Sequence, residues 1–130
     1  MNNCGIAVRD NGVLILVIDA PEGIAPDHLE LVEFGTSGTE AVLKLLEQGR
    51  VRDRVAAATY MAFWNTARRI NVILVSNGIT DQGAKKIGIR SVGTIDEAFK
   101  LACSVLGTDK PTVGVIPYGA DVIPVLDSES

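Results

Sequence analysis

The sequence predicts an α/β fold, in which helices cover both faces of a small and mainly parallel sheet to give a three-layer αβα sandwich. Two observations predict it. Short unbroken aliphatic runs are typical of strands buried on both faces, and the segments between them have the apolar spacing of helices. The two patterns alternate along the chain, as right-handed crossovers between parallel strands require. We therefore expect residues 1–130 to form one Rossmann-like domain.

Aliphatic runs bounded by turn residues mark the predicted strands, which are Val13–Ile18, Val72–Val75, Ile89–Val92 and Val113–Ile116. The unbroken run of the first strand favours a central position in the sheet. Alternation over residues 122–126 indicates a further strand near the C-terminus. Pro124 restricts that strand to the edge of the sheet, because proline has no N–H for the ladder.

Five helices are expected between and after the strands: from Pro26 to Phe34, from Ser37 or Thr39 to Gly49, from Arg52 to Arg69, from Thr80 to Gly88, and from Thr94 to Gly107. Thr94 followed by Glu97 is the spacing of a capping box, which predicts a helix start. Residues 4–9 resemble the last turn of a helix, so we expect that an opening helix starts upstream of this sequence.

The composition excludes several classes of protein. A hydrophobic fraction of 47% with 22% charged residues excludes wholesale disorder. The net charge of −4, with scattered basic residues, excludes a nucleic-acid surface. No apolar run reaches the ~20 residues of a membrane span, and the N-terminus lacks the order of a signal peptide. Cys4 and Cys103 are far apart and suit reduced thiols, so the expected location is cytoplasmic.

Polar residues gather where the predicted strands end. Because carboxyl ends of parallel strands share one edge, residues 19–23, 76–78 and 117–121 are expected on one rim. The polar side chains there are Asp19, Glu22, Ser76, Asn77, Tyr118 and Asp121. Two interpretations stay open: a ligand crevice, in which three of these carboxylates could act as acid–base groups, or plain turns, which use the same residue types.

Familiar catalytic patterns are absent from the sequence. We find no dinucleotide or phosphate-binding glycine motif and no nucleophile–histidine pattern, so no catalytic residue and no metal ligand is predicted. His28 is the sole histidine and is expected to face solvent in a first helical turn. Trp64, with Tyr60 and Phe63, is either core or interface packing or an aromatic wall over a substrate.

Four stretches, taken in order, carry a resemblance to a known family: RDNGVLILVIDAPEGI (9–24), RRINVILVSNG (68–78), KKIGIRSVGTIDEAF (85–99) and VGVIPYGADVIPVL (113–126). They resemble the C-terminal domain of the nickel-dependent lactate racemase family, which shows a strand ending in a Glu-Gly turn, a VILVS-like strand, a Thr-x-x-Glu-Ala helix and a final VIP-x-Gly segment. The resemblance covers nearly the full chain, and the order and spacing of the motifs carry it.

The resemblance implies a specific chemistry for the whole protein. Family members racemise or epimerise 2-hydroxy acids through a nickel pincer cofactor derived from a pyridinium mononucleotide, which takes a hydride from the substrate carbon and returns it to either face. The N-terminal domain carries the lysine that tethers the cofactor and the histidines that bind nickel and move protons. The C-terminal domain closes over the site and helps to position the substrate.

The chain is therefore expected to be the substrate-closing C-terminal domain of a two-domain isomerase, inactive alone. Its expected partners are the N-terminal domain, in the same chain or a separate one, and a small 2-hydroxy acid; an exposed interdomain patch could also pair two copies as a homodimer. No counterpart of the family's lysine and histidines is present, and the family's substrate-orienting Gln and Lys fall before Met1. Candidate cleft-lining residues are Glu22, Gly23, Trp64, Asn77 and Tyr118. The alternative is a stand-alone α/β module that binds small molecules or proteins without catalysis.

Overall fold

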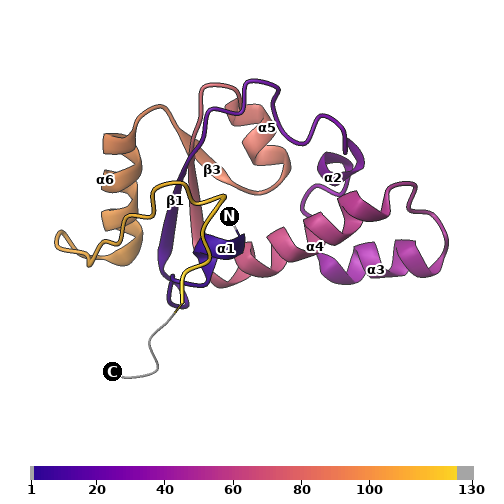
Figure 1. Cartoon of the computed structure of the whole chain (residues 1–130), viewed down its shortest axis with the longest axis horizontal. Helices are drawn as coiled ribbons and strands as arrows, with labels where there is room; N and C mark the ends of the chain where they lie inside the picture. Colours follow the sequence, from indigo (N-terminus) through magenta and orange to yellow (C-terminus); the bar gives the residue numbers. More distant parts are fainter. Residues whose placement is uncertain (1, 126–130) are drawn as a thin grey trace.

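The structure, a computed structural model, describes residues 2–125. Its elements in chain order are α1 (Asn2–Gly5), β1 (Val13–Val17), α2 (Glu30–Glu33), α3 (Thr39–Glu47), α4 (Arg54–Arg69), β2 (Asn71–Val75), α5 (Asp81–Lys86), β3 (Arg90–Val92) and α6 (Ile95–Leu106). The three strands form one parallel sheet in the order β1-β2-β3, with helices on both sides (Figure 1). The predicted α/β sandwich is confirmed.

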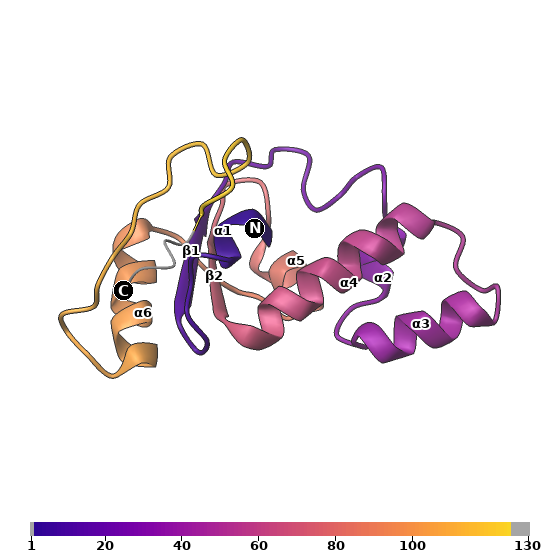
Figure 2. The same cartoon turned by 60° about the horizontal axis from the view of Figure 1, so that its bottom comes forward.

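Helices pack on opposite faces of the sheet. Figure 2 shows α6 on one side of β1 and β2, and α4 on the other. Val72 and Leu74 of β2 pack with α4 and α5, whereas Ile73 between them packs with α6. This alternation follows from the two-residue period of a strand, and it explains why β2 is aliphatic from Val72 to Val75.

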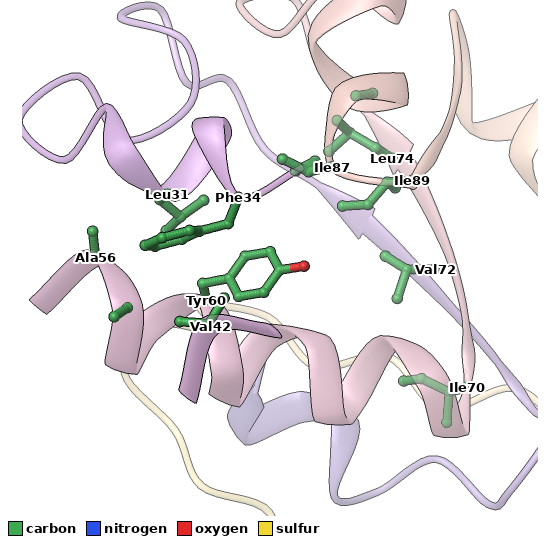
Figure 3. Close-up of a cluster of buried hydrophobic side chains, with 12 residues drawn as sticks. Leu31, Phe34, Val42, Ala56, Tyr60, Ile70, Val72, Leu74, Ile87 and Ile89 are labelled. Carbon is green, nitrogen blue, oxygen red and sulfur yellow. The ribbon is translucent and has the colours of Figure 1, made fainter. Parts of the chain in front are cut away.

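The larger part of the core lies between β2 and the helices α2 to α5 (Figure 3). Tyr60 of α4 is fully buried there, with its ring 5.3 Å from that of Phe34. Its hydroxyl is satisfied, because it accepts a hydrogen bond of 2.9 Å from the Gly38 backbone N–H. We call this cluster the α4/α5 core. The smaller cluster on the other face, the α6 core, contains the buried residues Ile73, Ala98 and Ala102.

Several helix ends follow the predicted signals. Thr94 and Glu97 form the complete capping box at the start of α6, and Gly107 ends that helix in the left-handed conformation. Gly49 follows α3 with a φ of 66°. The helix α3 begins at Thr39, one of its two predicted starts, although its N-cap is Gly38 and makes no side-chain cap. Among the described residues, no helix has both the length and the apolar character that crossing a membrane requires.

The predicted helix from Pro26 to Phe34 was wrong at its start. The helix begins only at Glu30. Ala25 has a φ of 44°, a left-handed conformation that no helix contains, and the following residues form turns. The Glu30 carboxylate also accepts hydrogen bonds from the backbone N–H groups of Arg52 and Asp53, so a tertiary contact helps to fix the start of α2.

The end of the chain also differs from the prediction. Residues 113–116 form no strand, and Val115 is 84% exposed. The predicted edge strand over 122–126 is likewise not formed at 122–125, and Leu126 lies outside the described residues. Pro117 to Asp121 do form the predicted turn, in which the Asp121 N–H donates to the Tyr118 carbonyl at 2.8 Å. Since no described strand pairs with its second side, β1 is an edge strand and not the predicted central one.

Candidate functional site

The loops that follow β1 and β2 meet at the carboxyl edge of the sheet, as predicted. The Gly78 N–H and the Ser76 hydroxyl both donate to the Asp19 carbonyl at 2.9 Å. The Asn77 amide lies 3.5 Å from an Asp19 carboxylate oxygen. We call residues 19–23 with 76–78 the rim. Hydrogen bonds to the Asp19 carbonyl hold the two loops together, and the exposed Glu22 and Asn77 side chains lie on the outer surface of the rim.

Gly78 is required by the close approach of the two rim loops. A Cβ built at this position would lie 1.8 Å from the Ala20 carbonyl oxygen, far inside any real contact. Ala20 itself has a φ of 45°, which turns its carbonyl toward Gly78. The Ser76 hydroxyl also accepts the N–H groups of Gly78 and Ile79, at 3.2 and 3.1 Å. The Ser-Asn-Gly sequence after β2 therefore encodes the geometry of the rim.

A shallow pocket of about 210 Å³ opens beside the rim. Gly23 and Gly78 contribute its rim side, Ile24 and Val32 are apolar wall residues, and Lys86 is the charged residue among those that line it. A lysine side chain beside an otherwise uncharged pocket suits a small anion such as a carboxylate. Among residues 2–125, no three His, Cys, Asp or Glu side chains form a group that could hold a metal ion.

The structure does not bring all of the predicted site residues together. Glu22, Gly23 and Asn77 lie on the rim. Tyr118 lies on the separate segment after α6 and is 82% exposed, with a φ of 56°. Its neighbour Gly119 packs against α1, where its carbonyl accepts a hydrogen bond of 3.4 Å from the Cys4 thiol. Among the described residues, no hydrogen bond joins Tyr118 or Asp121 to the rim, so hydrogen bonds tie together only two of the three predicted loops.

Trp64 lies away from the rim and packs inside the domain. Its ring stacks on Tyr60, with the centroids 5.9 Å apart. It also borders Gly38 and Gly88, the latter at the amino-terminal end of β3. The structure thus shows the packing interpretation of this aromatic stripe for Tyr60 and Trp64, while a contact of Trp64 with substrate stays a prediction.

A polar network at the start of α4 was not predicted. The imidazole Nδ1 of His28 lies 2.7 Å from the Asp53 carboxylate, while its side chain stays 42% exposed, as expected. His28 precedes α2, however, and is not in the predicted first helical turn. The other Asp53 oxygen caps α4 by accepting the N–H groups of Val55 and Ala56 at 2.9 Å. Glu30, itself buried, accepts the N–H of Asp53 at 2.6 Å. Asp53 before an alanine-rich helix was a readable cap signal, but no local pattern links it to Glu30.

Electrostatics in this network favour the two ionised carboxylates. Burial by itself would raise the pKa of Glu30, but hydrogen bonds from the backbone N–H groups of Asp53 and Arg52, with the charge of Arg52, outweigh it and lower the pKa. The pKa of Asp53 is lowered first by the Ala56 N–H and then by the hydrogen bond with His28. The network anchors the start of α4, because Asp53 caps the helix and Glu30 binds the backbone N–H of Asp53.

Comparison with known proteins agrees with this architecture. Residues 1–124 match the family described as the lactate racemase C-terminal domain. Among solved structures, the lactate racemase apoprotein from Thermoanaerobacterium thermosaccharolyticum is similar with a TM-score of 0.66 and 20% sequence identity, over 84% of this chain and 26% of that one. This chain thus spans about a quarter of the solved protein's length. A comparison with curated protein sequences found no match.

Proposed function

Since the chain belongs to the lactate racemase C-terminal domain family, we propose that it is the substrate-closing domain of a 2-hydroxy-acid racemase or epimerase that uses a nickel pincer cofactor. The N-terminal domain would hold the cofactor, which would supply the acceptor and donor of the substrate hydride. The family match favours this proposal over a stand-alone binding module.

The observation that carries the proposal is the form of the rim and its pocket. The rim is fixed by backbone hydrogen bonds, and the pocket beside it is shallow and open to solvent. An enzyme that completes its site alone encloses most of a small ligand. A pocket with one rigid wall and one open side suits a domain that covers a site built mainly by its partner.

Within this proposal, the residues of this chain act on the substrate and not on the metal. The proposal places the nickel ligands on the other domain. Lys86 would attract the carboxylate of the 2-hydroxy acid, and the Asn77 amide would offer hydrogen bonds to its oxygens. Closure of the rim over the substrate would exclude water from the reacting centre.

The test uses the natural product of the gene. An immunoblot of the source cells should show a band well above 13.8 kDa, or a separate partner should co-purify with the chain. The nickel-loaded protein should convert L-lactate or a related 2-hydroxy acid to a mixture of enantiomers, as measured by chiral chromatography. Lys86→Ala should lower kcat/KM by about ten- to a hundredfold, the effect of one lost charge-assisted hydrogen bond.

Lys110→Ala is the matched control, because Lys110 is exposed after α6 and does not line the pocket. It should leave kcat/KM unchanged. Equal activity of the Lys86 and Lys110 variants would show that the pocket does not bind the substrate carboxylate. Stoichiometric nickel and racemisation by the chain alone would overturn the division of labour between domains.

A further inference from the structure

One edge of the sheet is open although its strand is wholly aliphatic. The N–H of Ile18 donates to Val75 of β2 at 3.0 Å. Because successive N–H groups of a strand point in opposite directions, those of Val13, Ile15 and Val17 point to the other edge. No described strand pairs with that edge, and Val17 is 54% exposed. Open apolar edges invite a further strand.

A segment with the properties of a strand follows α6. Residues 113–116 read VGVI, and Val113 and Val115 are 60% and 84% exposed. Within the described part of the chain, no hydrogen bond joins the backbone of 113–117 to another residue. An extended apolar segment with unpaired peptide groups is the counterpart of the open edge of β1.

The connectivity brings this segment to that edge. The crossovers through α4 and α5 lie on one face and step from β1 to β2 to β3, whereas α6 crosses on the opposite face (Figures 1 and 2). A right-handed crossover on the opposite face steps in the opposite direction, from β3 back past β1. The contact between the Cys4 thiol and the Gly119 carbonyl already ties the end of the segment to α1, which immediately precedes β1.

We propose that residues 113–116 add to the open edge of β1 as a fourth parallel strand, giving the order 113–116, β1, β2, β3. This inference rests on the sheet alone and does not depend on the proposed function. The strand order then reverses between β1 and the added strand, which is where open α/β sheets bind ligands. The added strand places Tyr118 beside residues 19–23, so that the third loop joins the rim.

Amide hydrogen exchange on the 130-residue chain tests this pairing. The amides of Ile15 and Val17 should exchange as slowly as those of β2. Val115→Pro removes a donor from the added strand and should speed their exchange by about tenfold or more. Ile123→Pro is the matched control, since Ile123 is also apolar and 69% exposed but lies outside the segment. It should leave both rates unchanged.

Fast exchange of Ile15 and Val17 in the unmodified chain overturns the proposal, as does an equal effect of the two proline variants. Protection that increases with protein concentration also overturns it, because the occupant of the edge would then be a second copy. Protection that is independent of concentration and lost only in Val115→Pro supports it.

Discussion

On the face of the sheet covered by α4 and α5, the buried side chains form one large cluster around Tyr60, with Val72 and Leu74 beneath it. On the α6 face, the buried cluster consists of Ile73 and two alanines, Ala98 and Ala102. Phe99 of α6 remains 41% exposed. We infer that the α4/α5 core contributes most of the packing stability of the domain. The α6 face buries fewer side chains, and the unpaired C-terminal segment follows its helix.

The comparison can be tested on two neighbouring residues of one strand. Leu74 points into the α4/α5 core and Ile73 into the α6 core, and both are almost fully buried. Leu74→Ala should lower the free energy of unfolding by about 3–5 kcal/mol, because its rigid surroundings cannot close the cavity. Ile73→Ala should cost about 2 kcal/mol, since α6 can move inward over the small alanines.

Urea unfolding of both variants measures the difference, with Ile73→Val as a control for a small loss of volume. Equal losses of unfolding free energy for Leu74→Ala and Ile73→Ala would mean that the two faces are equally rigid. That result would contradict the inferred difference between the two cores.

The rim provides a second and smaller test, because its pocket shares Ile24 and Val32 with the α4/α5 core. Gly78→Ala places a Cβ against the Ala20 carbonyl and should destabilise the domain by about 1–3 kcal/mol, the usual cost of overpacking. Gly114→Ala is the matched control, since a Cβ there meets nothing within 4 Å. If Gly78→Ala unfolds at the same urea concentration as Gly114→Ala, the rim is not rigid.

The difference between the α4/α5 face and the α6 face also shows which elements could be predicted from the sequence. The strands at Val13 and Val72 were predictable because local aliphatic runs decide them, and the helix at Thr94 because the capping box lies within four residues. Residues 113–116 have the same local pattern but form no strand in the structure, because pairing is a long-range event that a local pattern does not show. A pattern therefore predicts the capacity to form a strand, and the neighbouring edge decides whether it forms.

The candidate site divides in the same way. Ser76, Asn77 and Gly78 are turn residues, and their position after a strand was enough to predict the meeting with residues 19–23. The pairing of His28 with Asp53 was not predictable, because 25 residues separate them and no local pattern brings them together. Lys86 was missed as a pocket residue, since nothing in its local sequence distinguishes it from a solvent-facing lysine.

Acid should affect the anchor of the α4/α5 face through Glu30 and Asp53. The pKa of each carboxyl is lowered in the folded chain, so both contribute stability above the pKa of the unfolded chain, about 4, and this stability is lost as the pH falls through the lower folded pKa. Urea unfolding from pH 7 downward should therefore show stability falling below about pH 5. Glu30→Gln removes one of the two titrating carboxyls, so this variant should be less stable at neutral pH but lose less on acidification. Parallel curves of unfolding free energy against pH for the variant and the unmodified chain would show that acid destabilises the chain through other groups. The network at the start of α4 would then not be what stabilises the α4/α5 core.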